Sequence, residues 1–198
     1  MLLTVAVLAL DVLKPLDPAG PSFDCSKATA VVPLLICADD TLIGLDRDMA
    51  SRYAAWRSAH PADADAVKRQ AGWLAQRDAC ASAAERQACV SSAYQQRITE
   101  LKILAGQAPV FAAATYLCAG QAGVVTASYY HSAPAAVLIE YQGARVVAFS
   151  VPAGSGARYT AEGVELWEHQ GTAALKWRGQ DLKCPRSQNN TTTSGQHP

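Results

Sequence analysis

The chain has 198 residues, half of them hydrophobic, and its 17 basic side chains balance its 17 acidic ones. This length favours one domain or two small ones, and the hydrophobic fraction is enough to form a core. Nucleic-acid-binding proteins usually carry a basic excess, so the balanced charge argues against a nucleic-acid partner.

The chain opens with an apolar run over residues 2–10, which is too short to span a bilayer. Residues 11–22 are rich in proline and glycine. We therefore interpret residues 1–21 as a signal-like apolar segment and linker, with a buried N-terminal strand as the alternative. The usual basic region before such a run is missing, and the residues before Cys25 do not support a lipid anchor.

Six cysteines are distributed along the rest of the chain: Cys25, Cys37, Cys80, Cys89, Cys118 and Cys184. None has the spacing of a zinc site, so no metal is expected. An even number of cysteines favours disulfides in an oxidising compartment, and hence an exported protein of the periplasm, cell envelope or medium. Pairing of sequence neighbours is the simplest of many possible pairings, and six reduced core thiols are the alternative.

Residues 22–106 show helical periodicity and are predicted to form a small disulfide-bonded helical domain. A first helix, ended by His60-Pro61, has an apolar stripe of Leu42, Leu45, Met49, Tyr53 and Trp56. A second is expected from about Ala62, with Val67, Ala71 and Leu74 on its apolar side. A third carries Val90, Tyr94, Ile98 and Leu101. Trp56 and Trp73 are expected to anchor this core.

Residues 109–184 change to short segments with period-two alternation, separated by turn residues. The predicted strands cover residues 124–130, 137–141, 144–149, 164–167, 174–177 and 181–184. Gln142-Gly143 indicates a hairpin turn. This pattern predicts a small antiparallel β-barrel, in which Cys118 and Cys184 would join the first strand to the last. The fold class is therefore α+β in two domains, followed by a polar tail over residues 185–198 that we expect to be disordered.

One segment is unusual for a simple turn. Residues 154–159 read Gly-Ser-Gly-Ala-Arg-Tyr, and His169 follows Ser155 by fourteen residues. Glycines permit close approach of the backbone to a partner, while a serine hydroxyl and a protonated imidazole can both donate hydrogen bonds. Arg158 and Tyr159 could equally act as internal fasteners of the fold. Trp167 is expected in the core.

Two sets of residues resemble known inhibitor families. The helical half resembles the N-terminal domain of LprI-type lysozyme inhibitors, through the residues at 23–25, 36–37, 45–46, 53, 70, 73–74, 77–78, 80, 89, 94, 97–98 and 101. The β half resembles the MliC-type inhibitors of c-type lysozyme, through Tyr116, Cys118, the segment 155–159, Trp167, Gly171 and Cys184. The resemblance implies a bacterial envelope protein that blocks host lysozyme with two loops. In that family a lysine stands where this chain has His169.

The chemistry agrees with this implication, because lysozyme carries one carboxylic acid and one carboxylate beside the scissile bond. Donors that reach these groups would block them. The expected lysozyme-binding residues are Ser155, Gly156, Ala157, Arg158, Tyr159 and His169. No enzymatic activity, cofactor or small-molecule substrate is expected. The alternatives are a serine hydrolase that uses Ser155, His169 and Glu165, and a general cell-envelope binding module.

Overall fold

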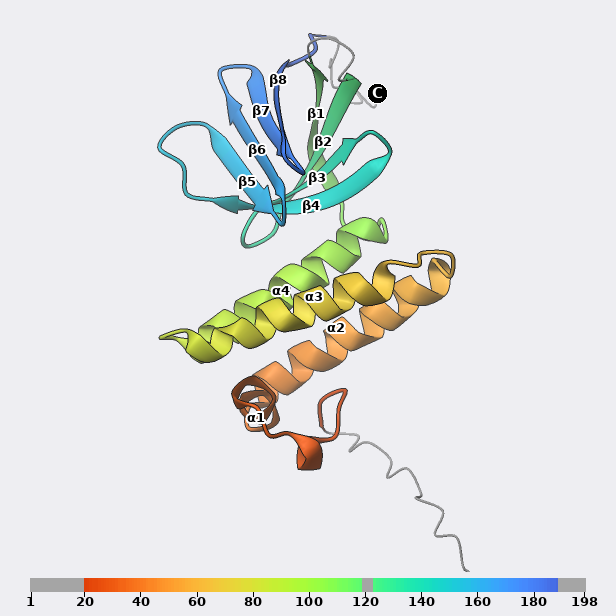
Figure 1. Ribbon diagram of the computed structural model, residues 1–198, viewed down its shortest axis with the longest axis vertical. Helices are drawn as coiled ribbons and strands as arrows, with labels where there is room; N and C mark the ends of the chain where they lie inside the picture. Colours follow the sequence, from red (N-terminus) through yellow and green to blue (C-terminus); the bar gives the residue numbers. More distant parts are fainter. Residues whose placement is uncertain (1–19, 119–122, 189–198) are drawn as a thin grey trace, which may run out of the picture.

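The computed structural model describes residues 20–118 and 123–188. Most of the signal-like segment (1–19) and of the polar tail (189–198) lies outside the described residues. Helices occupy the first half of the described chain and an eight-stranded antiparallel sheet the second, in agreement with the predicted α+β class (Figure 1). The helices lie together below the barrel, and the chain near residue 20 lies at the end of the helical half that is remote from the barrel (Figure 1).

The helical half contains four α-helices and two short 3-10 segments among the described residues. The α-helices are α1 Val31–Cys37, α2 Asp40–Ala59, α3 Ala66–Asp78 and α4 Arg86–Leu104, and the 3-10 segments are Cys25–Lys27 and Ala79–Ser82. Asp39 caps α2, since its side chain accepts a hydrogen bond from the Leu42 N–H at 2.8 Å. The separate helix α1 was not distinguished in the sequence pattern.

The predicted apolar faces of α2 and α4 are largely confirmed, but that of α3 is wrong. Val90, Tyr94, Ile98 and Leu101 are all buried. In α3, however, Val67 is 60% exposed, whereas Gln70 and Arg77 are buried. The inward face therefore lies one position earlier than the apolar residues suggested. Polar side chains can occupy it because they find hydrogen-bond partners inside the bundle.

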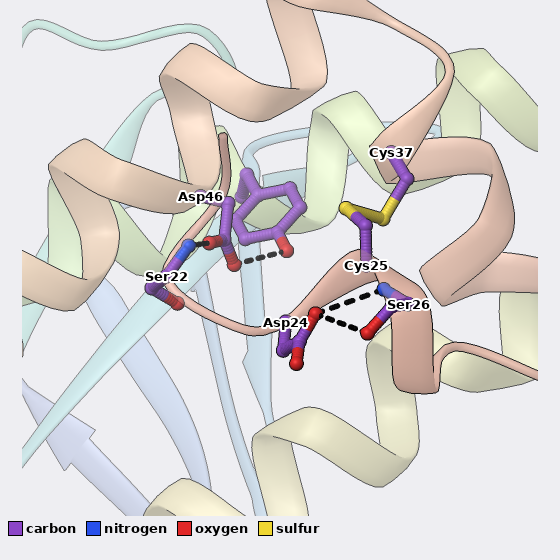
Figure 2. The surroundings of a disulfide bond; sticks show 7 residues. Ser22, Asp24, Cys25, Ser26, Cys37 and Asp46 are labelled. Atoms are coloured by element: carbon purple, nitrogen blue, oxygen red, sulfur yellow. Dashed lines mark hydrogen bonds between the residues drawn. A yellow bond between two sulfur atoms is a disulfide. The ribbon is translucent and has the colours of Figure 1, made fainter. Parts of the chain in front are cut away.

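A buried polar network connects α2, α3 and α4 to the N-terminal segment. Arg77 donates to the Tyr94 hydroxyl at 2.8 Å, and that hydroxyl donates to Asp46 at 2.8 Å. Asp46 also accepts the Ser22 N–H at 2.5 Å, close to the Cys25–Cys37 disulfide (Figure 2). A cavity of about 400 Å³ lies beside this network. Because Asp46 holds Ser22, the network fastens the start of the described chain to the bundle.

The eight strands follow one another in order, and each pairs antiparallel with the next. They are β1 Val110–Cys118, β2 Gly123–Tyr130, β3 Ala136–Tyr141, β4 Ala144–Val151, β5 Ala157–Ala161, β6 Val164–His169, β7 Thr172–Trp177 and β8 Gln180–Pro185. Tyr116 forms an isolated antiparallel β-bridge with Arg186, and the Ser187 N–H donates to the Thr115 carbonyl at 2.8 Å. The chain after β8 therefore lies beside β1. The result is a nearly closed barrel. The sequence prediction gave no residue range for β1 or β5, although it expected Cys118 on the first strand.

Three disulfides lie in the described chain, and each pairs sequence neighbours: Cys25–Cys37, Cys80–Cys89 and Cys118–Cys184. The third joins β1 to β8, across a sequence separation of 66 residues. In the chain-entropy account, a link over such a long loop is worth roughly 4 kcal/mol.

The helices and the barrel share a small apolar cluster. Ile103 near the end of α4 packs with Tyr130, Ala136, Leu138 and Val147 from the outer face of β2, β3 and β4. Ile103 is only 1% exposed. Each half thus covers apolar surface that the other would otherwise leave in water.

Candidate functional site

The loop that carries Ser155 connects β4 to β5 at one end of the barrel. Residues 152–156 are exposed, and β5 begins directly after them. Gly156 has φ +68°, and a Cβ there would overlap the main-chain carbonyl oxygen of Glu168. Only glycine fits a left-handed position in contact with a neighbouring backbone. Gly156 therefore lets the Ser155 loop pack directly against the end of β6.

The end of β6 is fixed by a tight hairpin. His169 is its last residue, and Gln170 and Gly171 follow with φ +47° and +74°, values suited to a two-residue turn. The Arg186 N–H donates to the Gly171 carbonyl at 2.8 Å, which ties the turn to the chain after β8. His169 is half-buried, and its Nδ1 lies 3.3 Å from the position that a Cβ at Gly156 would take.

Trp167 is not a core residue, contrary to the sequence expectation. Its side chain is 40% exposed. Successive residues of a strand point to opposite faces, and because Val164 and Leu166 point into the barrel, Trp167 points outward. The indole N–H donates to the Ser155 carbonyl at 2.9 Å. Trp167 thus supports the Ser155 loop from outside the barrel.

Arg158 and Tyr159 lie on opposite faces of β5. Tyr159 points to the core, and its ring lies 5.9 Å from that of Tyr129. Arg158 forms an ion pair with Glu165 on β6, and Lys176 on β7 lies 3.7 Å from the other Glu165 oxygen. The Arg158 hydrogen bond, with the two cations, lowers the pKa of the Glu165 carboxyl. Both residues of the segment are engaged in holding β5 in place.

The barrel brings Ser155, Gly156 and His169 to one end, although Ser155 and His169 are fourteen residues apart in the sequence. The pairing of Ala157 with Glu168 produces this proximity. The arrangement does not favour a hydrolytic triad. Glu165, the acid considered for it, already binds two cations, and within the described chain the Ser155 hydroxyl hydrogen-bonds to no other side chain.

Glu168 was not singled out from the sequence, yet it lies between these elements. The hydroxyls of Tyr116 and Tyr129 both donate to its Oε1 atom. A pocket of about 160 Å³ opens beside it, lined by Tyr116, Gly156, Glu168, His169, Gln170, Gly171, Thr172 and Arg186. The sequence did contain a signal for Glu168 as a functional residue. In the alternation of β6 it takes an inward position, as Val164 and Leu166 do, and an acid at an inward position is unusual.

The described residues contain neither a metal-binding cluster nor a helix suited to crossing a membrane. No group of three or more His, Cys, Asp or Glu side chains there is placed to hold a metal ion. None of the helices in the described ranges combines the length and apolar character needed to cross a membrane.

Comparison with known proteins gives two significant results. Residues 116–183 match the MliC family, described as membrane-bound lysozyme inhibitors of c-type lysozyme. Lipoprotein LprI of Mycobacterium bovis, and that of the Mycobacterium tuberculosis strains CDC 1551 and H37Rv, are each 36% identical over 170 residues. The match covers 85% of this chain and 86% of each relative. No solved structure gives a significant match. The chain therefore belongs to the LprI family of lysozyme inhibitors, and its β half is an MliC-type domain.

Proposed function

We propose that the protein is an exported inhibitor of c-type lysozyme that blocks the catalytic cleft with the Ser155 loop and the His169 turn. The observation that carries this proposal is the contact between the two elements at one end of the barrel, where Gly156 packs on the Glu168 backbone. The MliC match over this half supports the choice of partner. The disulfides and the family's naming as lipoproteins favour an exported or envelope location.

The chemistry of inhibition follows from the donors at this end. The Ser155 hydroxyl can donate to a lysozyme carboxylate, and a protonated His169 can donate a charge-assisted hydrogen bond to the other catalytic group. The loop is already held by the Trp167 indole and by the Gly156 contact. Binding therefore orders few additional residues, which reduces its entropic cost.

A turbidity assay tests the proposal, with purified full-length protein added to lysozyme acting on bacterial cell walls. The wild type should inhibit, and Ser155→Ala and His169→Gln should each weaken binding by about tenfold, as expected for loss of one hydrogen bond to a charged group. Ser51→Ala and His60→Gln are matched controls, because both residues lie in the helical half. They should inhibit like the wild type.

Two results would contradict this function. Lysozyme that remains fully active at a large excess of folded wild-type protein would exclude inhibition. Turnover of an ester or peptide substrate by the protein alone, abolished in Ser155→Ala, would instead support a hydrolase.

A further inference from the structure

Glu168 lies next to both proposed lysozyme-binding elements, the Ser155 loop and the His169 turn. It directly precedes His169 on β6, and its backbone pairs with Ala157 at the start of β5. Its side chain takes the inward phase of the strand, where Tyr116 and Tyr129 donate to Oε1. The adjacent pocket places this carboxyl at the mouth of the barrel, between Gly156 and the His169 turn.

The charged and titratable groups around Glu168 come from several elements. They are Tyr116 on β1, Tyr129 on β2, Tyr159 on β5, His169 on β6 itself and Arg186 after β8. Strand β7 faces Glu168 with Ala173, which does not titrate. Within the described residues no cation forms an ion pair with the Glu168 carboxylate, and Arg186 acts on it only at longer range. The carboxylate form is thus partly buried without a paired charge.

Both forms of this carboxyl are accessible near neutral pH. Burial raises the pKa of Glu168 to about 7, while the Arg186 charge opposes this rise. Because both phenols donate to Oε1, Oε2 is left to carry the proton. The neutral acid then has an O–H donor of its own at the barrel mouth.

We propose that Glu168 is a further lysozyme-binding residue, which meets the enzyme as a neutral carboxylic acid and opposes binding as a carboxylate. This inference rests on the proposed function. The catalytic groups of lysozyme are themselves carboxyls. A Glu168 carboxylate next to His169 would repel a lysozyme carboxylate, and this repulsion is strong because the site is partly desolvated. As the acid, Glu168 adds no negative charge to the mouth of the barrel, where Arg186 carries a positive one.

The direction of the pH dependence follows from linkage. A lysozyme carboxylate nearby favours the protonated form, so the pKa of Glu168 is higher in the complex than the value of about 7 in the free protein. The affinity is therefore complete below about pH 7 and falls as the pH rises from the free pKa through the bound one. The complex takes up a proton in that range.

The test compares dissociation constants of full-length wild type and Glu168→Gln for lysozyme from about pH 5.5 to 8.5. Glutamine keeps an oxygen that accepts from both tyrosines and remains neutral at every pH. At pH 5.5 the two proteins should bind alike. At pH 8.5 Glu168→Gln should bind about three- to tenfold more tightly, since tenfold corresponds to one pKa unit between bound and free states. The ratio at each pH cancels the titration of lysozyme itself.

Tyr129→Phe provides a second, independent variant. It removes one hydrogen bond to the charged form of Glu168, so the pKa of that carboxyl should rise and the loss of affinity should begin at a higher pH. A purely structural effect of the tyrosine would weaken binding equally at every pH. Calorimetry in buffers of different ionisation enthalpy should show less proton uptake on binding for Glu168→Gln than for the wild type.

Three outcomes overturn the proposal. Parallel curves for wild type and Glu168→Gln would show that Glu168 does not contact lysozyme. Weaker binding of Glu168→Gln at pH 8.5 would mean that the carboxylate pairs with a lysozyme cation. Absence of any inhibition by the wild type would remove the proposed function itself, which separates that failure from the first two.

Discussion

The two halves of the molecule hold their polar side chains in different ways. In the helical half, the buried polar residues are hydrogen-bonded inside the bundle: Arg97 donates to Gln70, and the Tyr94 hydroxyl connects Arg77 to Asp46. In the barrel half, the buried positions in the described strands are mainly apolar, and the polar group Glu168 lies at an open end. An internally satisfied network serves stability, whereas a polar group at a pocket is placed to meet a partner. We therefore expect mutations in the two halves to separate stability from affinity.

Asp46→Ala should give the largest effect on stability. It leaves the Tyr94 hydroxyl and the Ser22 N–H without their acceptor, and an unsatisfied buried donor costs roughly 1–3 kcal/mol. We expect a loss of about 4 kcal/mol in the free energy of unfolding by urea. The dissociation constant for lysozyme, measured where the variant is still folded, should not change. A parallel loss of affinity would show that the helical half takes part in binding.

Ile103→Ala tests the connection between the halves. The side chain is fully enclosed by α4 and the outer face of β3 and β4, so its truncation should cost about 2–3 kcal/mol. The shared cluster couples the unfolding of the two cores. Calorimetry of Ile103→Ala should therefore resolve two unfolding transitions. In the wild type these transitions should overlap or lie closer together in temperature. The exposed Val67→Ala serves as the control and should leave the thermogram unchanged. Identical thermograms for all three proteins would mean that the Ile103 side chain stabilises neither half.

The same cluster bears on whether the β half can be isolated. We expect residues 109–198 to fold and inhibit, since Ser155, His169 and the Cys118–Cys184 disulfide all lie there. A fragment cut at residue 109 exposes Leu138 and Val147, however, so it should be less soluble than the full chain. Extending the fragment back to include Ile103 should restore part of that cover.

Gly156→Ala should affect inhibition more than stability. A left-handed conformation costs a non-glycine residue roughly 1–2 kcal/mol, and the added Cβ also meets the Glu168 carbonyl. Relief of that contact moves the Ser155 loop away from the His169 turn, so lysozyme should bind more than about tenfold more weakly. Gly154→Ala is the matched control, because a Cβ at that exposed position meets nothing within 4 Å. Equal affinity of the two variants would indicate that the spacing of the two elements does not matter for binding.

The sequence predicted this fold well where one signal dominated. The stripe of α4 has apolar residues at regular helical spacing, and Gln142-Gly143 matches its hairpin turn, with φ +50° and +76°. The face of α3 was mispredicted because Gln70 and Arg77 are buried through partners on other helices, which no local pattern reveals. The proximity of Ser155 to His169 likewise depends on the pairing of β5 with β6. Trp167 was misplaced because a large aromatic residue can hold a loop from outside the barrel.

The smallest expected effect concerns His169, where the family resemblance implies a lysine. An imidazole loses its positive charge through the neutral pH range, whereas a lysine keeps its charge up to pH 8.5. If His169 binds as a cation to a lysozyme carboxylate, His169→Lys should lose less affinity than the wild type between about pH 5.5 and 8.5. His169→Gln should be weaker than the wild type at low pH by up to about tenfold and should converge with it at high pH. Because Glu168 titrates in the same range, the series is best measured in the Glu168→Gln background as well. Three parallel curves in both backgrounds would mean that the Ser155 loop acts without His169.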